Sequence, residues 1–337
     1  LLSVERQQKV KEALYLFLLQ KREENELSQA FTAYNTRIVT PPHGSMLPTS
    51  PVRKNIFMVA FALGLLIPIV IIFMRENMNT RVRGRKDLES VTVPFIGEIP
   101  LFTRKKKRIF GKKPQEVKAV VVKEGNRDII NEAFRVLRTN LEFMTGKDKT
   151  SNVIIMTSFN PGSGKSFLTM NIAMSLAIKG KKVLVIDGDL RHASASSYID
   201  SPDKGLSDYL GGRIDNLDEI IVPDPKHKSM DILPVGTIPP NPTELLFDER
   251  LKQTIDTVRE QYDYVLIDCP PVELVADTQI IEKLADRTIF VVRAGLLERS
   301  MLSELEKIYD EKKYKNMSLI LNGTEGSGGR YGYRYGY

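Results

Sequence analysis

Cysteine and histidine are scarce in this sequence of 337 residues, which contains one cysteine, Cys269, and three histidines. A single cysteine excludes an intrachain disulfide and is typical of a reducing compartment. So few, scattered ligands argue against a structural zinc site. The hydrophobic fraction of 42% is close to that of globular proteins, so the chain can bury a sizeable core in one large domain or two smaller ones. The first residue is leucine rather than methionine, which suggests a piece of a longer protein.

Charged residues are absent from Ile56 to Met74, a run of nineteen apolar residues. As a helix this run would be about 28 Å long, which matches the hydrocarbon layer of a membrane. Apolar side chains on every face argue against the alternative, a buried core helix. Basic residues are more frequent after the run than before it, so the positive-inside rule predicts a cytoplasmic location for everything after Met74. We therefore expect a transmembrane helix over 55–74 and an extracytoplasmic segment over 1–54.

The segments on either side of this span differ in character. Before it, a charged helical pattern runs from about Val4 to Tyr34, and four prolines follow between Pro41 and Pro51. The helical pattern leaves a coiled coil open, whereas the prolines favour a stiff, extended lead into the membrane. After the span, seven basic residues and no acidic one lie between Arg104 and Lys113. Such a run binds nucleic acid or an anionic surface, and its place favours the inner leaflet. We therefore expect 75–125 to be a basic juxtamembrane linker, with no nucleic acid as a partner.

Short apolar runs alternate with helical patterns beyond about Asn126. Five of these runs have the length and composition of buried strands: Val153–Thr157, Val183–Asp187, Tyr264–Asp268, Thr288–Val292 and Ser318–Asn322. Helical patterns fill the stretch that ends near Gly180, and also Thr243–Glu260 and Arg299–Tyr314. Apolar strands separated by helices predict an α/β domain over 126–325, with a parallel sheet covered by helices on both faces. The glycine-rich residues 326–337 are expected to form a flexible tail, because they cannot pack a core.

A phosphate-binding loop is predicted between the first of these strands and the next helix, where the sequence reads Asn160-Pro-Gly-Ser-Gly-Lys-Ser166. Two glycines let the backbone approach a phosphate chain, and the amides of a helix N-terminus point at it. The Lys165 ammonium would face the outer phosphates, and the Ser166 hydroxyl would bind Mg²⁺. Phe159 replaces the first glycine of the usual loop. The alternative interpretation is an ordinary strand–turn–helix.

Three aspartates follow two further strands and strengthen the nucleotide interpretation. Asp187 and Asp189 lie at the end of one strand, and Asp268 ends another. The carboxyl ends of parallel strands meet at the crevice where ligands bind. Carboxylates beside a polyphosphate imply a hard cation, and Mg²⁺ fits. Within a continuing strand Asp187 and Asp189 would point to the same face of the sheet.

These three pieces resemble the Walker A, A′ and B motifs of bacterial tyrosine kinases, which are related to the deviant P-loop ATPases of chromosome partitioning and division-site selection. Asn160 stands where those ATPases carry a signature lysine, as is usual for the kinases. A helical E-x-x-R-x-x-R sequence is similar to the motif with which such kinases pack into rings: Glu132, Arg135 and Arg138. The alternative for that helix is a solvated stripe with internal ion pairs. The span and the proline-rich segment before it resemble the end of a polysaccharide co-polymerase region.

The C-terminal tail resembles the autophosphorylation cluster of these kinases, with four tyrosines at alternate positions: Tyr331, Tyr333, Tyr335 and Tyr337. An edge strand with one aromatic face, or a sticky low-complexity tract, is the alternative. The resemblance implies an enzyme that uses ATP and Mg²⁺ to phosphorylate this tail in trans within a homo-oligomeric ring. It also implies a place in the bacterial inner membrane, with the kinase domain in the cytoplasm, and a role in exopolysaccharide or capsule polymerisation and export. The expected partners are an export channel, a polymerase and a tyrosine phosphatase.

The resemblance also assigns roles to residues. Catalysis would fall to Lys165, Asp187 and Asp189, with Asp187 as the base that orients the attacking phenol. The Mg²⁺ ligands would be Ser166, Asp189 and Asp268. The nucleotide would contact the loop and, near the adenine, the end of the last strand: Pro161, Gly162, Ser163, Gly164, Lys165, Ser166, Phe167 and Asn322. Two other functions stay open. One is a membrane-bound P-loop ATPase switch, and the other is a structural chain-length regulator without kinase activity.

Overall fold

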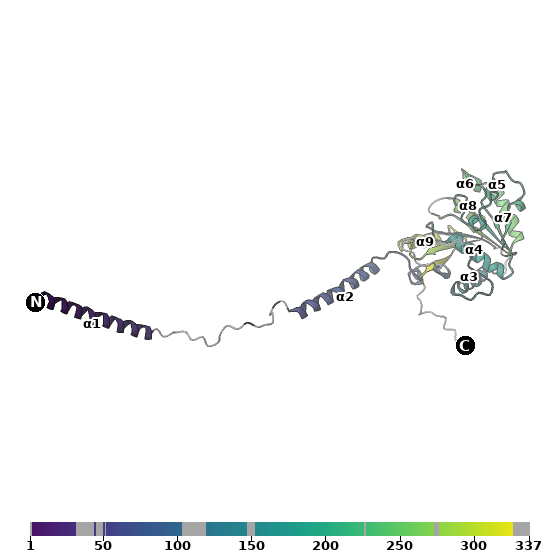
Figure 1. The fold of residues 1–337 in the computed structure, drawn as a ribbon. Coiled ribbons are helices and arrows are strands. Elements are labelled where there is room, and N and C mark those ends of the chain that lie inside the picture. The colour runs from purple at the N-terminus through teal and green to yellow at the C-terminus, as the bar shows by residue number, and fades with distance from the viewer. Residues whose placement is uncertain are drawn as a thin grey trace, which may run out of the picture. The chain divides into compact units, whose positions relative to one another are not determined.

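A computed structural model describes residues 2–31, 44, 50, 52–102, 119–146, 152–225, 227–272 and 276–325. The chain divides into two compact units, Leu1–Asn77 and Met78–Tyr337 (Figure 1). Three of the predicted features lie outside the described residues: the four tail tyrosines, the basic run Arg104–Lys113 and most of the proline-rich segment. The predictions for them stay predictions.

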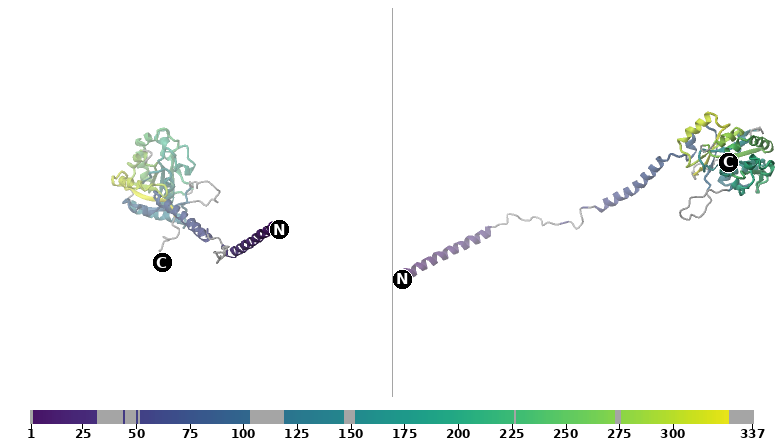
Figure 2. Two further views of the ribbon diagram at one scale, coloured as in Figure 1. Left: turned by 90° about the vertical axis from the view of Figure 1, so that its left-hand side faces the viewer. Right: turned by 90° about the horizontal axis from the view of Figure 1, so that it is seen from above.

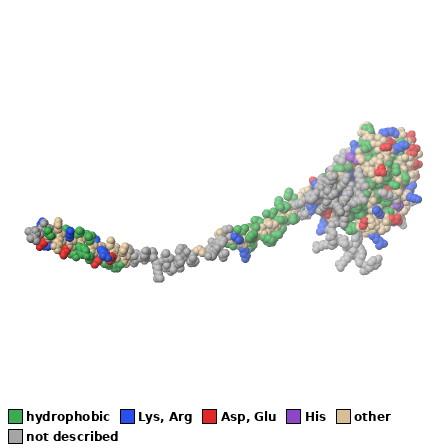
Figure 3. Space-filling view, in the orientation of Figure 1, with side chains coloured by type: hydrophobic (Ala, Val, Ile, Leu, Met, Phe, Trp, Pro, Cys, Tyr) green, Lys and Arg blue, Asp and Glu red, His purple; other side chains and the backbone are tan. Residues whose placement is uncertain are grey.

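The first unit contains two helices, α1 (Leu2–Phe31) and α2 (Arg53–Asn77). Residues Arg53–Met74 have a mean hydropathy of 3.0, and none of the residues in the apolar window is buried. Hydrophobic side chains cover much of this helix in Figure 3. By length and composition α2 can cross a membrane, as the uncharged run predicts. Its single proline, Pro68, is tolerated in such helices because neighbouring groups can satisfy the freed carbonyl.

The second unit is built on one sheet of eight strands among the described residues. Their order across the sheet is β1-β8-β7-β2-β6-β3-β5-β4. All neighbouring pairs are parallel except β4 and β5. The strands are β1 (Phe95–Pro100), β2 (Val153–Thr157), β3 (Val183–Asp187), β4 (Val222–Pro223), β5 (Met230–Leu233), β6 (Tyr264–Asp268), β7 (Arg287–Arg293) and β8 (Ser318–Thr324). The predicted parallel α/β fold is therefore confirmed, and all five predicted strands are present.

Helices cover both faces of this sheet, as Figure 1 and the two views in Figure 2 show. One face carries α3 (Ile129–Thr145) and α4 (Lys165–Ile178). The other face carries five shorter helices: α5 (Leu206–Leu210), α6 (Pro242–Leu246), α7 (Glu249–Gln261), α8 (Asp277–Glu282) and α9 (Met301–Asp310). Successive residues of β2 alternate between the two cores, as the pleat of a strand requires: Val153 and Ile155 pack on one side, Ile154 and Met156 on the other.

The structure corrects three of the local predictions. Residues 75–125, expected to be a linker, contain β1, which pairs with β8 at the edge of the sheet. The predicted helix over Thr243–Glu260 is two helices, because the chain breaks at Phe247 and the Asp248 carboxylate caps the second by accepting the Arg250 N–H at 2.8 Å. The strand β3 ends at Asp187 and does not continue to Asp189, so the two carboxylates do not share a strand face.

Candidate active site

The loop between β2 and α4 is held by hydrogen bonds from both sides. The hydroxyls of Ser158 and Ser163 donate to the carbonyl of Asn160 at 2.8 and 2.7 Å. Gly164, the N-cap of α4, has a φ of +87°, a conformation that glycine adopts without strain. From β8 the Asn322 amide donates to the Ser163 carbonyl at 2.8 Å, and a Cβ on Gly164 would overlap that amide. The Asn322 amide on β8 therefore helps to hold the loop in this conformation.

Lys165 begins α4 and is 9% exposed. Its ammonium donates to the Ser158 hydroxyl at 3.3 Å. Burial lowers the pKa of Lys165, and the carboxylates of Asp268 and Asp189 oppose that effect. The Lys165 ammonium is thus directed back over the loop, and the carboxylates of Asp268 and Asp189 favour its charged form.

Asp187 and Asp268 lie side by side, because their strands β3 and β6 are in register at these two residues. Both are buried, and neither carboxylate oxygen of Asp268 has a hydrogen-bond partner of standard geometry. Burial first, and then the nearby Asp187 carboxylate, raise the pKa of Asp268 to about 8. A buried carboxylate without a partner needs a cation or a proton, so Asp268 fits the role of a ligand for a hard metal ion.

Asp187, in contrast, is already occupied. One of its oxygens accepts the backbone N–H of Ser196 at 2.7 Å and the hydroxyl of Ser196 at 2.6 Å. The other accepts the Asp189 N–H at 3.3 Å. Burial raises the pKa of Asp187 to about 6, although the bonds from Ser196 act against it. Asp187 therefore fixes the course of the chain after β3, and both of its oxygens accept hydrogen bonds from that segment.

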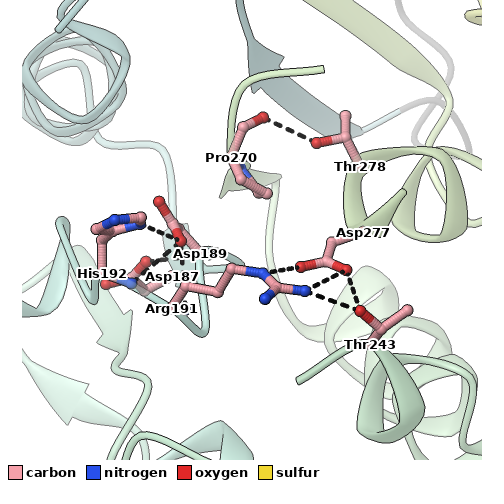
Figure 4. A network of polar contacts seen from close by, with 8 residues as sticks. All are labelled: Asp187, Asp189, Arg191, His192, Thr243, Pro270, Asp277 and Thr278. Atoms are coloured by element: carbon pink, nitrogen blue, oxygen red, sulfur yellow. Dashed lines mark hydrogen bonds and ion pairs between the residues drawn. The ribbon is translucent and has the colours of Figure 1, made fainter. Parts of the chain in front are cut away.

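The segment after β3 is joined to α8 by an ion pair between Arg191, which is partly exposed, and Asp277, which is buried (Figure 4). Asp189 accepts the backbone N–H of His192 at 3.2 Å and lies 3.3 Å from the imidazole Nδ1. The Arg191 guanidinium donates to Asp277 at 3.0 and 3.4 Å, and the Thr243 hydroxyl donates to the same carboxylate at 2.7 Å. Asp277 itself is fully buried. This network joins the segment after β3 to helices α6 and α8.

A cavity of about 380 Å³ opens in front of the loop. It is lined by most of the predicted nucleotide contacts, namely Pro161, Gly162, Gly164, Lys165, Ser166, Phe167 and Asn322, and by Asp189. Asp187, Asp268 and Ser163 are not among the described residues that line it. Within the same described part of the chain, no three acidic, histidine or cysteine side chains gather into a group that could hold a metal ion. A cation here would therefore take further ligands from phosphate oxygens and water.

Two family models match the chain: one described as "AAA domain" over residues 151–320, and one described as "G-rich domain on putative tyrosine kinase" over residues 1–77. The tyrosine-protein kinase etk of Escherichia coli strain K12 is 29% identical over 323 residues, which are 93% of this chain and 44% of that protein. The solved kinase domain of this E. coli kinase is 30% identical with a TM-score of 0.64, over 76% of this chain and 100% of the domain. The chain belongs to the bacterial tyrosine kinases.

Other members of the family give the same result. The tyrosine-protein kinase wzc of Salmonella typhimurium is 30% identical over 318 residues, which are 92% of this chain and 43% of that protein. The solved BceF tyrosine kinase domain is 30% identical with a TM-score of 0.61, over 72% of this chain and 99% of that domain. The chain thus spans less than half the length of the curated relatives.

The helix motif that suggests ring assembly lies on α3. Glu132 and Arg135 form an ion pair of 2.7 Å, and Arg135 also donates to the Asn126 carbonyl. The Arg138 guanidinium donates to the Ser175 carbonyl on α4 at 2.9 Å. The structure thus gives the arginines contacts within the chain, and an interface role for the motif stays a prediction.

Sequence reasoning missed seven residues that line the cavity: Leu101, Phe102, His192, Ser194, Tyr198, Pro271 and Arg293. Arg293 ends β7 and could have been found by the rule that located the aspartates, because strand ends meet at this edge of the sheet. Leu101 and Phe102 follow β1 and carried no such signal, since β1 itself was not predicted.

Proposed function

We propose that the chain is the membrane-anchored part of a protein tyrosine kinase that transfers phosphate from ATP to its own C-terminal tyrosines. The observation that supports this function best is the buried lysine of the phosphate loop, which lines a cavity of about 380 Å³ and is close to the carboxylates of Asp268 and Asp189. Phosphoryl transfer needs positioned positive charge and a bound cation more than covalent chemistry. Lys165 provides the first, and the carboxylates of Asp268 and Asp189 are suited to bind the second.

Within this proposal Lys165 and the loop amides bind the outer phosphates, and Lys165 stabilises charge that develops on the transferred group. Ser166 and Asp268 hold Mg²⁺, with Asp189 nearby. The Asp268 carboxylate supports that assignment, because both of its oxygens are buried with no hydrogen bond of standard geometry, and Ser166 and Lys165 lie close enough to act on its pKa. When bound, Mg²⁺ neutralises the phosphate oxygens and orients them for displacement.

The carboxylate that meets an incoming phenol is Asp189 in this proposal. Asp189 lines the cavity, whereas both oxygens of Asp187 accept hydrogen bonds from the chain. A group that orients a hydroxyl and takes its proton must reach it, either within hydrogen-bond distance or through one water. Asp187 then positions Asp189 through the backbone N–H of that residue, rather than acting as the base itself.

The anchor and the assembly complete the proposal. Helix α2 crosses the inner membrane, residues 1–54 lie outside the cytoplasm, and the kinase domain is cytoplasmic and takes in β1. The tail, residues 326–337, enters the site of a neighbouring subunit in a ring that uses Glu132, Arg135 and Arg138. The activity regulates the polymerisation and export of exopolysaccharide or capsule, together with an export channel, a polymerase and a phosphatase. The names of the relatives as tyrosine-protein kinases support the kinase part of this proposal.

The test compares two lysine variants of the complete protein in detergent, incubated with Mg·ATP, with tail phosphotyrosine counted by mass spectrometry. Lys165→Met should lower the initial rate of phosphorylation at least about 100-fold, as loss of a group that stabilises the transition state does. Lys181→Met, at a partly exposed lysine outside the cavity, is the control and should keep the wild-type rate. Wild-type phosphotyrosine in Lys165→Met would refute the kinase. ATP hydrolysis by the wild type without phosphotyrosine would favour the ATPase switch instead.

A further inference from the structure

Two adjacent residues at the start of α8, Asp277 and Thr278, contact both of the segments that follow the site's acidic strands (Figure 4). Both side chains are fully buried. One of the segments comes after β3 and contains Asp189, and the other comes after β6 and directly follows Asp268. A single short helix thus makes contact with two parts of the chain that are about eighty positions apart.

Asp277 contacts the segment after β3 through Arg191, which stands two positions after Asp189. The Asp277 carboxylate accepts the Arg191 guanidinium at 3.0 and 3.4 Å and the Thr243 hydroxyl at 2.7 Å. The guanidinium also donates to the Thr243 hydroxyl at 2.9 Å. Each of these three side chains therefore contacts the other two, and this fixes the position of Arg191 in the segment.

Thr278 contacts the segment after β6 through Pro270, which stands two positions after Asp268. The Thr278 hydroxyl donates to the Pro270 carbonyl at 2.8 Å. The buried Thr157 hydroxyl, at the end of β2, donates to the same carbonyl at 2.9 Å. A carbonyl oxygen has two lone pairs, so these two bonds satisfy it. The segment after β6 is therefore fixed between α8 and the strand that leads into the phosphate loop.

Helix α8 also packs against the backbone between Asp187 and Asp189. The Gly188 N–H donates to the Asp268 carbonyl at 2.9 Å, so the segment after β3 is bonded to the end of β6. A Cβ at Gly188 would lie 3.1 Å from the Ile281 side chain of α8 and 3.1 Å from the Asp268 carbonyl oxygen. Glycine suits this position because α8 and the two strand ends approach one another so closely.

The separation of the aspartates needs to be fixed because their charges repel. Burial, and then the carboxylates of Asp187 and Asp189, raise the pKa of Asp268, so these groups act on one another at short range. Mg²⁺ requires oxygen ligands at about 2.0–2.1 Å in near-ideal octahedral geometry. Segments that were free to move apart would bind the cation less tightly. In metal sites, residues that orient the ligands typically change the metal affinity about 10- to 100-fold.

We propose that Asp277 and Thr278 are positioning residues for Mg²⁺, which keep Asp189 and Asp268 within reach of one cation. Neither of them is among the described residues that line the cavity, so they act through the two segments and do not touch the cation. The inference rests on the proposed function and deepens it, because it names the residues that hold the two acidic segments together.

The experiment measures how much Mg²⁺ tightens the binding of ADP to the complete protein in detergent. Isothermal titration calorimetry gives the Kd of ADP in EDTA and in saturating Mg²⁺, and the ratio of the two constants measures the contribution of the cation. Thr278→Val and Asp277→Asn keep the size of each side chain but remove its hydroxyl or its charge. Thr278→Ser keeps the hydroxyl. The control is Thr254→Val, at a buried threonine of α7 whose hydroxyl donates to the Arg250 carbonyl at 2.7 Å.

We expect the ratio to fall about tenfold in Thr278→Val and in Asp277→Asn, which is the lower end of the range for residues that orient metal ligands. Their Kd in EDTA should stay within about twofold of wild type, because the amides of the loop bind phosphate without the cation. Thr278→Ser and Thr254→Val should keep the wild-type ratio. Binding of ADP in EDTA also shows that a variant is folded, and Asp277→Asn decides the test if Thr278→Val does not fold.

Each other outcome overturns the inference. If the two variants keep the wild-type ratio, α8 does not position the carboxylates. If Thr254→Val lowers the ratio equally, the effect is one of general stability. If the variants also lose ADP in EDTA, the two residues support the whole site and not the cation. If Mg²⁺ does not tighten ADP binding to the wild type, the metal site is refuted and the inference with it. A wild type that binds no ADP at all refutes the proposed nucleotide function itself.

Discussion

The ion pair between Arg191 and Asp277 gives a stability prediction that tests the link between the segment after β3 and helix α8. The Asp277 side chain is 1% exposed and that of Arg191 is 35% exposed. In Arg191→Ala the Asp277 carboxylate keeps the hydrogen bond from the Thr243 hydroxyl but loses the guanidinium. A buried charge that loses its partner typically destabilises a protein by about 3–5 kcal/mol. We expect about 3 kcal/mol here, because water can reach the place of the arginine. A domain of this size loses about 2–4 °C per kcal/mol, so the melting temperature should fall by about 6 to 12 °C.

The assay is thermal unfolding of the complete protein in detergent at pH 7, followed by circular dichroism. Adding Asp277→Asn to Arg191→Ala removes the unpaired charge, so the double variant should be more stable than Arg191→Ala alone. Lys252→Ala is the control, because it breaks an exposed ion pair with Glu249 that should contribute less than about 1 kcal/mol. The reasoning is refuted if Arg191→Ala melts like the control, or if the second substitution lowers the melting temperature further.

Three further predictions concern the loop, the buried acid and the anchor. Gly164→Ala should abolish binding of ADP by calorimetry, since a Cβ there meets the amide beneath the loop and the backbone has a positive φ; wild-type binding would contradict this. Burial and a neighbouring carboxylate raise the pKa of Asp268 to about 8 in the folded protein, above an unfolded value of about 3.9. Without metal, the stability that Asp268 contributes is therefore present at low pH and is lost as the pH rises toward 8. In EDTA, Asp268→Asn should therefore raise the melting temperature more at pH 8 than at pH 5, and an equal change at both pH values would count against the shift. In the complete protein, a reporter that is active only outside the cytoplasm should be active when it is fused after Tyr34 and silent when it is fused after Ser90, and the opposite pattern would reverse the proposed orientation.

Local patterns in the sequence are enough to predict the central strands and the chemistry of the loop. The runs that become β2, β3, β6, β7 and β8 are apolar because both faces of a central parallel strand are buried, and this signal needs no knowledge of the neighbours. The uncharged run of α2 and the glycine–lysine loop are equally local. The acids at the strand ends follow from the rule that parallel strands end at one edge of a sheet.

The missed strands lack that signal. β1 is an edge strand that contains glycine, glutamate and proline, and β5 is short. A polar edge strand is recognised by its partner, and β8 lies more than 200 residues further along the chain than β1. Sequence reasoning consequently placed β1 in a linker, and Leu101 and Phe102, which line the cavity, were not part of the predicted site.

The sequence by itself determined the class of the site: a phosphate loop with its lysine and three aspartates, all in a domain that follows a predicted membrane span. The tertiary structure decided which group each side chain contacts. The Asn322 amide donates to the Ser163 carbonyl, Asp187 accepts two hydrogen bonds from Ser196, and the Asp268 carboxylate is buried with no hydrogen bond of standard geometry. These outcomes depend on pairs such as Asn322 and Ser163, which are 159 positions apart and meet only because β8 is placed two strands away from β2. Residue type and spacing determine what a side chain can do, and the packing of distant strands determines which partner it has.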